Sequence, residues 1–209
     1  MKKNQIKNIR TFAKDQDLVS ERRGKILKTA IRLFVKKGYL KTSIREIADE
    51  CGLGKGTLYH YIGKKEDILD MMSDTGMSWV KNIEEIANKL RQLPPAERLS
   101  IIIRTYLQYV DENQDHIVFW YQETKNLTSE SRKHLFDAEM FCMNMFKTLL
   151  EDGQSKGVFE FDDAEYMAND IVTLCDMWAF RRWYLRKRYT LESYTQNRIR
   201  SILKAAGAD

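Results

Sequence analysis

One short segment of the chain concentrates side chains that could bind nucleic acid: Gly54-Lys55-Gly56-Thr57-Leu58-Tyr59-His60-Tyr61. A helix that buries Leu58 and the following Ile62 would present the polar and aromatic members outward, namely Lys55, Thr57, Tyr59, His60 and Tyr61. Lysine can bind a phosphate or a guanine edge, and the threonine methyl can contact thymine. Hydroxyl and imidazole groups can donate hydrogen bonds to phosphate oxygens. The segment therefore predicts a face that binds nucleic acid.

The glycines of this segment allow two interpretations. Gly56 costs about 1 kcal/mol relative to alanine inside a helix, but a position without a side chain lets the backbone approach a duplex closely. The run Gly52–Thr57 is superficially similar to a phosphate-binding loop, yet its spacing differs and it follows a helix instead of a strand. We therefore favour nucleic-acid binding. The alternative for Tyr59 and Tyr61 is packing inside their own domain.

The charge of the chain is divided unevenly along its length. Of the 209 residues, the first 65 carry 17 Lys and Arg against 6 Asp and Glu, and the others carry 18 against 24. The net charge of +5 therefore hides a basic N-terminal third and an acidic remainder. This pattern favours a polyanion-binding domain joined to one that does not bind polyanions. A solvated, lysine-rich tail is the alternative.

Groups that could catalyse a reaction or hold a metal are scattered. Three cysteines (Cys51, Cys142 and Cys175) and three histidines (His60, His116 and His134) show neither metal-ligand spacing nor clustering. No nucleophile and base recur at a useful spacing. We therefore expect no disulfide framework, no metal, no cofactor and no enzymatic activity. No membrane span or secretory signal is apparent either, so we expect a cytoplasmic protein.

Hydrophobic periodicity and capping residues predict an all-α chain of about nine helices. From Ser20 an apolar stripe runs to a stop at Gly38, and Ser43 with Glu46 forms a capping box that opens a short helix ending at Gly52. The next short helix runs from Gly54 to Tyr61, so residues 43–62 are typical of a helix-turn-helix. Longer helices are expected at 68–90, from Pro95 to 110, at 117–124, at 135–150 with an end at Gly153, from Asp162 or Asp163 to about Arg186, and from Thr190 to about Ala205.

The segment from Thr42 to Leu69 closely resembles the DNA-binding domain of TetR-family transcriptional regulators, in the type and spacing of some fifteen positions of TSIREIA…CGLGKGTLYHYIGKKEDIL. The resemblance implies three N-terminal DNA-binding helices, followed by helices that bind a ligand and form a dimer. It implies that Thr42 and Ser43, at the start of the second helix, hold a phosphate on the N-terminal N–H groups of that helix, and that Lys55, Gly56, Thr57 and Tyr59 enter the major groove. His60, Tyr61 and Lys65 would contact the DNA backbone, with Lys64 nearby. Gly54 replaces the usual capping Ser or Thr, and Ile62 replaces the usual Phe.

We therefore expect a flexible basic arm at residues 1–19, a DNA-binding domain at 20–80 and a ligand-binding and dimerisation domain at 81–209. The helix before Arg186 carries two apolar stripes, one of them through Met167, Ile171, Leu174 and Trp178. Burial on two sides would follow if this helix and the last one formed a homodimer interface. The alternative is a central helix buried within a monomer.

A ligand site is expected among the large apolar residues of the C-terminal domain, although core packing is the alternative for each of them. The candidates are Trp79, Tyr106, Trp120, Tyr121, Glu123, Met140, Met143, Met177, Trp178, Arg181 and Arg182. The basic run Arg181, Arg182, Arg186, Lys187 and Arg188 could bind the phosphates of an acyl-coenzyme A. Residues 178–194 also loosely resemble TetR-type regulators of fatty-acid breakdown. A solvated helix end is the alternative.

The combined expectation is a dimeric repressor that binds a palindromic, double-stranded DNA operator. It would be released by a small, largely apolar effector, such as an acyl-coenzyme A or another hydrophobic compound. The alternative is a helical ligand- or protein-binding module whose N-terminal domain contacts a protein partner instead of DNA.

Overall fold

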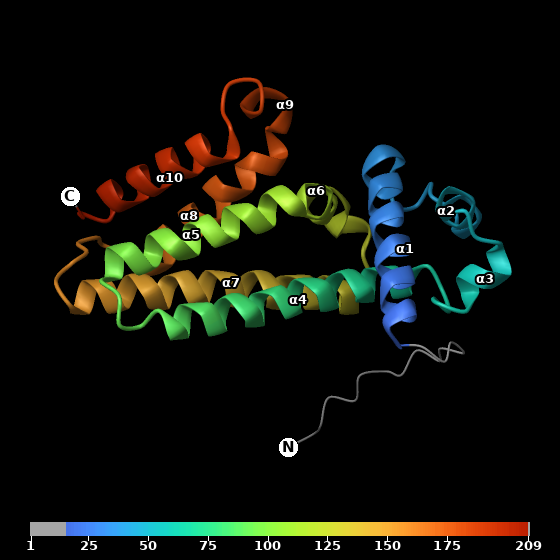
Figure 1. Cartoon of the computed structure of the whole chain (residues 1–209), viewed down its shortest axis with the longest axis horizontal. Coiled ribbons are helices and arrows are strands. Elements are labelled where there is room, and N and C mark those ends of the chain that lie inside the picture. The colour runs from blue at the N-terminus through green and yellow to red at the C-terminus, as the bar shows by residue number, and fades with distance from the viewer. Residues whose placement is uncertain (1–15, 209) are drawn as a thin grey trace, which may run out of the picture.

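The computed structural model describes residues 16–208, in which ten α-helices and one 3₁₀ turn form an elongated, all-helical molecule (Figure 1). The expected arm at residues 1–19 falls for the most part outside the described residues. The helices are α1 (Gln16–Lys37), α2 (Ile44–Cys51), α3 (Lys55–Tyr59), α4 (Glu66–Lys89), α5 (Pro95–Glu112), α6 (Gln114–Glu123), α7 (Ser129–Ser155), α8 (Ala164–Phe180), α9 (Arg182–Leu185) and α10 (Leu191–Ala205), and the 3₁₀ turn η1 is Thr124–Asn126.

Helices α1, α2 and α3 form a small unit at one end of the molecule, which we call the head. Its core includes Phe34, Ile47 and Leu58, each at most 1% exposed. Local chemistry sets the helix ends, because Gly38 and Gly52 adopt left-handed backbone conformations with φ of 87° and 68°. The predicted ends of α1 and α2 are therefore confirmed.

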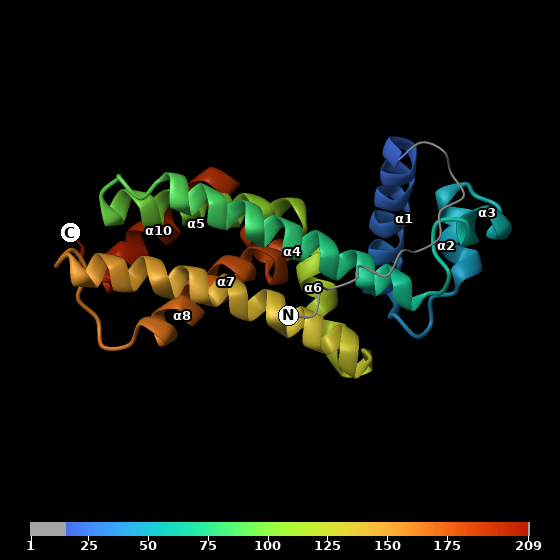
Figure 2. The same ribbon diagram turned by 90° about the horizontal axis from the view of Figure 1, so that it is seen from below.

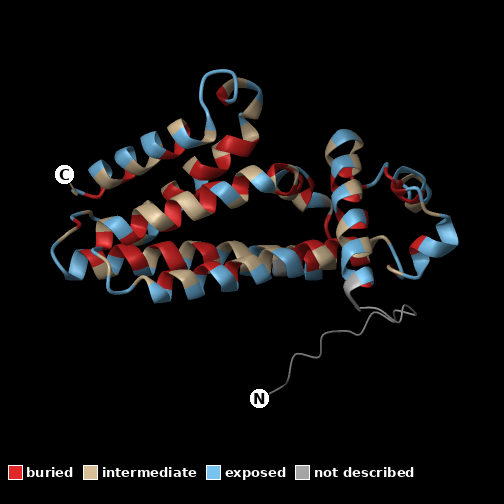
Figure 3. Cartoon of the chain, in the orientation of Figure 1, coloured by how far each residue is buried: buried red, intermediate tan, exposed pale blue. Residues whose placement is uncertain are grey.

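The remaining helices form the body, a bundle whose buried residues face one another (Figure 3). Helix α4 runs continuously from the head into the body, as two perpendicular views show (Figures 1 and 2). The expected boundary between residues 80 and 81 therefore lies inside a helix. The head core also takes Phe119 and Leu127 from the body, so the two parts share packing.

Several predicted helix ends differ from those observed. Helix α1 already includes Gln16, the first described residue and four residues before the expected start. Helix α7 begins at Ser129 because the Thr128 hydroxyl caps it by accepting the Ser131 N–H at 3.1 Å. The helix expected to reach Arg186 ends at Phe180, and a separate short helix α9 follows. This break raises the predicted count of nine helices to ten.

Gly153 does not end α7 as predicted, because the helix continues to Ser155. Gly153 instead leaves space for the Phe159 ring. A β-carbon added at Gly153 would lie 2.1 Å from Cδ2 of Phe159, a ring that is 3% exposed. The glycine therefore lets the chain after α7 fold back onto the helix.

Gly153→Ala should destabilise the protein by about 1–3 kcal/mol, because the Phe159 ring must move out of the core. Helix propensity alone predicts a gain of up to about 1 kcal/mol. Gly24→Ala in α1 is the matched control, since a β-carbon there meets nothing within 4 Å. Urea unfolding of both variants measures the difference. A stabilised Gly153→Ala protein would contradict the packing argument.

The two apolar stripes of α8 are largely buried within the single chain. Ile171, Val172, Cys175 and Trp178 are each at most 4% exposed, because α8 packs against α5, α6 and α7. These stripes are thus explained without a partner, as the monomer alternative stated. Within residues 16–208, no helix has the length and apolar character needed to cross a membrane.

Candidate nucleic-acid interface and ligand cavity

The turn between α2 and α3 sets the geometry of the head. Ser43 caps α2 by accepting the Glu46 N–H at 3.2 Å, and the Glu46 carboxylate accepts the Ser43 N–H at 2.8 Å. The left-handed Gly52 then reverses the chain into α3. Gly54 begins α3 without a side-chain cap. This arrangement has the geometry of a helix-turn-helix.

Helix α3 separates buried from exposed residues as its sequence predicts. Leu58 and the following Ile62 are fully buried, which fixes the orientation of the helix. Lys55, Gly56, Thr57 and Tyr59 are exposed. The Lys55 ammonium lies 5.9 Å from the centroid of the Tyr59 ring, and a β-carbon at Gly56 would meet nothing within 4 Å. The exposed side therefore combines a cation, hydroxyl groups and accessible backbone.

Residues flanking α3 divide between surface and interior. Ser43, His60 and Lys64 are exposed, and Tyr61 is half-buried against the head core. Helix α3 ends at Tyr59, so His60 and Tyr61 lie in the turn that follows instead of the helix.

Two residues that are expected to lie at the DNA backbone, Thr42 and Lys65, have side chains that point inward. The Thr42 side chain is buried, and its hydroxyl donates to the Gly38 carbonyl at 2.9 Å. The Lys65 ammonium donates to the Tyr39 carbonyl and lies 4.0 Å from the Tyr39 ring centroid. Partial burial lowers the pKa of Lys65. Both side chains therefore stabilise the head. The expected phosphate contacts, through the N-terminal N–H groups of α2 for Thr42 and through the side chain for Lys65, stay predictions.

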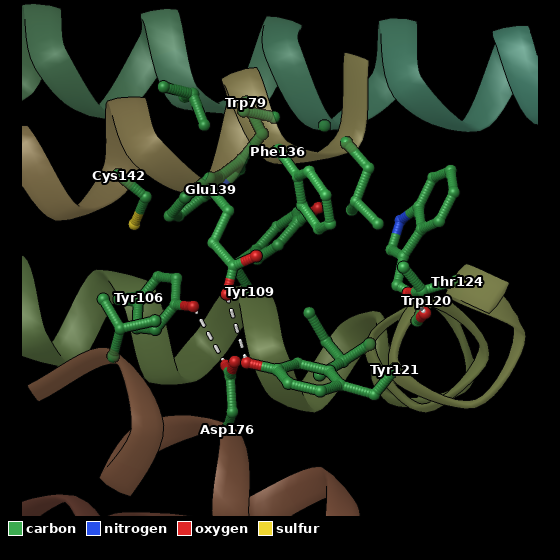
Figure 4. A pocket seen from close by; sticks show the side chains of 16 residues that line it. Trp79, Tyr106, Tyr109, Trp120, Tyr121, Thr124, Phe136, Glu139, Cys142 and Asp176 are labelled. Atoms are coloured by element: carbon green, nitrogen blue, oxygen red, sulfur yellow. Dashed lines mark hydrogen bonds between the residues drawn. The ribbon is translucent and has the colours of Figure 1, made fainter. Parts of the chain in front are cut away.

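A cavity of about 310 Å³ lies in the body between α4, α5, α6, α7 and α8 (Figure 4). Most of its wall is aromatic or aliphatic. Its lining residues are Gly76, Trp79, Val80, Tyr106, Tyr109, Ile117, Trp120, Tyr121, Thr124, Leu135, Phe136, Ala138, Glu139, Cys142, Val172 and Asp176. Its size is at the lower end of known ligand pockets, about 300–1,000 Å³.

Two carboxyl groups interrupt the apolar wall. Asp176 is 4% exposed and accepts a hydrogen bond from the Tyr106 hydroxyl at 2.9 Å. Glu139 accepts one from the Tyr121 hydroxyl at 3.2 Å. Figure 4 shows these four side chains directed toward one another. The pKa of Asp176 is raised to about 7, chiefly because the group is buried; the Tyr106 hydrogen bond lowers this pKa and the nearby Glu139 charge raises it.

Four of the eleven residues predicted to bind a ligand line this cavity: Trp79, Tyr106, Trp120 and Tyr121. The four others with apolar side chains, Met140, Met143, Met177 and Trp178, do not. Trp178 is buried in the body core and donates to Asp111 at 2.6 Å. The sequence pattern could not separate core packing from cavity lining, because both need large apolar groups.

The predicted polar ligand contacts also lie elsewhere. Glu123 accepts the Tyr39 N–H at 3.2 Å and so joins body to head. Arg182 pairs with Asp115 at 2.6 Å, and the Arg181 guanidinium lies 5.0 Å from the Tyr184 ring centroid. None of these three residues lines the cavity.

Sequence reasoning missed the polar residues that do line the cavity, chiefly Asp176, Glu139 and Tyr109. One signal was present, because Asp176 is the one charged residue in the otherwise apolar stretch 174–180 of α8. A buried carboxyl group needs a specific partner or a function. Glu139 carried no such signal, since α7 contains several other acidic residues.

Helix α6 connects the cavity to the head. Ile117, Trp120 and Tyr121 line the cavity, whereas Phe119 is fully buried in the head core with its ring centroid 5.3 Å from that of Phe34. A shift of α6 would therefore change both the cavity wall and the packing of the head core. In the described part of the chain, no group of His, Cys, Asp and Glu is arranged to hold a metal ion.

Comparison with known proteins gives consistent matches over most of the chain. Residues 26–72 match the family model of bacterial regulatory proteins of the tetR family, and residues 92–187 match a tetracyclin repressor-like C-terminal domain. The HTH-type transcriptional regulator HbdR of Aromatoleum sp. (strain CIB) is 28% identical over 94% of this chain and 85% of its own length. The HTH-type transcriptional repressor KstR2 of Mycobacterium tuberculosis is 27% identical over 79% of this chain and 82% of its own. The crystal structure of AibR in complex with isovaleryl coenzyme A and operator DNA has the same fold, with a TM-score of 0.70 and 24% identity over 85% of this chain and 96% of that one.

Proposed function

Because the chain belongs to the TetR family of DNA-binding transcriptional regulators, we propose that it is a repressor that binds a palindromic operator as a dimer. A small, largely apolar effector would bind the body cavity and release the DNA. The observation that carries this proposal is the exposed side of α3, where Lys55, Gly56, Thr57 and Tyr59 surround the fully buried anchor Leu58.

In this proposal α3 enters the major groove, since only that groove admits a helix and presents a distinct pattern for each base pair. Lys55 binds a guanine edge or a phosphate, and the Thr57 methyl contacts thymine. Gly56 allows close approach of the backbone. Ser43, His60, Tyr61 and Lys64 contact backbone phosphates, which fix the position of the head without reading sequence.

Dimerisation would use the outer sides of α8 and α10. Tyr166 on α8 is 68% exposed, and Met177 on the same helix is half-buried. Leu191 and Ile199 on α10 are also half-buried. These residues, and not the buried stripes of α8, supply the apolar surface for a partner. Two heads would then meet half-sites about 34 Å apart, one helical turn of DNA.

Release would follow from a shift of α6. A ligand in the cavity contacts Ile117 and Trp120, while Phe119 and Glu123 of the same helix contact the head. A ligand that prefers one position of α6 would move the population of dimers toward a head spacing that no longer fits both half-sites.

The cavity is better suited to a hydrophobic effector than to the phosphates of an acyl-coenzyme A. No Lys, Arg or His is among the residues that line it. The basic run expected to hold the phosphates is engaged elsewhere, since Arg182 and Arg186 pair with Asp115 and Asp111. We therefore propose an effector whose main contacts are aromatic and aliphatic.

Lys55→Ala and Gly56→Ala should each weaken operator binding about tenfold or more. The first removes a base or phosphate contact worth about 1–3 kcal/mol, and the second places a methyl group where the backbone approaches the DNA. The operator would first be selected from fragmented genomic DNA and sequenced. Gly56→Ala is informative because the added methyl group meets nothing in the protein. Fluorescence anisotropy at two salt concentrations measures the affinities.

Lys204→Ala is the matched control, since it removes the same charge from an exposed position on α10. It should leave operator affinity within about twofold, a change of less than about 0.5 kcal/mol. Light scattering checks that every variant keeps the wild-type mass. Unchanged binding by both Lys55→Ala and Gly56→Ala would contradict the assignment of α3 as the recognition helix.

A further inference from the structure

The two carboxyl groups of the cavity indicate the chemical class of its ligand more specifically than the apolar wall does. Asp176 projects from α8 and Glu139 from α7 into the same cavity. Among the residues that line it, none carries a positive charge to balance them. The groups that face Asp176 from α5, α6 and α7 are the hydroxyls of Tyr106, Tyr109 and Tyr121, the Cys142 thiol and the Glu139 carboxyl.

The fold does not account for the buried Asp176 carboxyl group. Asp176 accepts one hydrogen bond, from the Tyr106 hydroxyl, although an ionised carboxylate has about four acceptor sites. A buried carboxylate without a cation is costly, and the proximity of Glu139 adds repulsion. A positively charged group between the two would relieve both effects.

The rings around the carboxyl groups suit a cation with an apolar body. Trp79 stacks on Tyr109 with centroids 4.0 Å apart, and Tyr106 lies 5.5 Å from Trp79. Trp120 and Phe136 line the same cavity. Aromatic faces attract organic cations within about 6 Å, more strongly where water is excluded. The same faces pack against the apolar part of a ligand.

We infer that the cavity binds a small organic amine in its protonated form, with the ammonium group between Asp176 and Glu139 and an aromatic or aliphatic body against Trp79, Tyr109 and Trp120. This inference rests on the proposed function, because it names the chemical class of the proposed effector. The ammonium group would donate hydrogen bonds to the carboxylates, and charged hydrogen bonds of this kind are stronger than neutral ones.

Three probes of nearly equal size test the inference: 2-phenylethylamine, 2-phenylethanol and 3-phenylpropionate, which are a cation, a neutral molecule and an anion at pH 8. Isothermal titration calorimetry without DNA should show the amine binding at least about tenfold more tightly than the alcohol. The carboxylate should bind more weakly than both, because it meets two negative charges.

Asp176→Asn and Glu139→Gln should each remove most of this preference and bring the amine within about threefold of the alcohol. Both substitutions preserve shape and remove charge. Asp170→Asn on α8 and Glu130→Gln on α7 are the matched controls, since neither residue lines the cavity. Both controls should retain the wild-type preference. Circular dichroism verifies that all four variants are folded.

Failure of the amine to bind, or binding of the alcohol or the carboxylate as tight as that of the amine, would overturn the inference. A preference that survives Asp176→Asn and Glu139→Gln together would also overturn it. Operator release is measured separately with the same amine. An amine that binds the cavity but leaves DNA bound would support the ligand class and contradict the proposed release mechanism.

Discussion

Asp176→Asn should stabilise the unliganded protein at pH 8 by about 4 kcal/mol, the free energy that corresponds to a carboxyl pKa of about 7 in place of 3.8. Because the folded pKa is raised, the folded state binds the proton more tightly than the unfolded state. The Asp176 charge therefore does not lower the free energy of unfolding below about pH 4. It lowers it progressively as the pH rises from about 4 to 7, and the full loss is reached above pH 7. Asparagine retains an acceptor for the Tyr106 hydroxyl and carries no charge.

Urea unfolding at pH 4 and pH 8 measures this effect. The variant and the wild type should have nearly equal stability at pH 4 and differ strongly at pH 8. Asp170→Asn is the control on the same helix and should show no comparable gain. A destabilised Asp176→Asn protein at pH 8 would mean that the carboxylate has a structural partner, which would also weaken the argument for a ligand amine.

Phe119→Ala should lower the free energy of unfolding by about 3–5 kcal/mol, the usual cost of deleting a large buried aromatic side chain. Its ring is fully buried between Phe34 and Tyr39, with centroid distances of 5.3 and 6.5 Å. The loss should loosen the contact between α6 and the head. Phe119→Leu, which keeps most of the volume, should cost less and permit assays of DNA release.

Phe136→Ala is the matched control for the size of the deletion, since this phenylalanine on α7 is 46% exposed. It should cost about 1 kcal/mol or less, because little buried surface is lost. Equal costs for the two substitutions would contradict the view that α6 is packed into the head. Operator release by a cavity ligand should be weaker in Phe119→Leu, while affinity without ligand changes less.

The Asp176→Asn prediction describes a protein that is not optimised for stability at its proposed ligand site. A charge that destabilises the empty cavity becomes favourable when a cation binds, and binding then contributes directly to the stability of the complex. Thermal unfolding with and without 2-phenylethylamine would measure that contribution.

Much of the head could be predicted because its determinants are local. The capping box of Ser43 and Glu46, the left-handed glycines 38 and 52, and the inward positions of Leu58 and Ile62 all follow from residues within one turn of each other. The all-helical class was equally readable from periodicity, and the family models support it. The inward direction of the Thr42 and Lys65 side chains could not be predicted in this way, because their partners, Gly38 and Tyr39, depend on how the loop folds back.

The sequence by itself determined the helices, the outward face of α3 and the family. Only the tertiary structure decided which residues of the body form a cavity, because the lining residues come from five helices and the 3₁₀ turn and are spread over positions 76–176. Periodicity shows that a side chain is turned inward, but it does not show whether that side chain meets a neighbour or an empty volume. The same limit explains Glu123, which was expected to face a ligand and instead accepts a hydrogen bond from Tyr39, 84 residues away. A contact over that separation is set by how whole helices pack, and no local pattern encodes it.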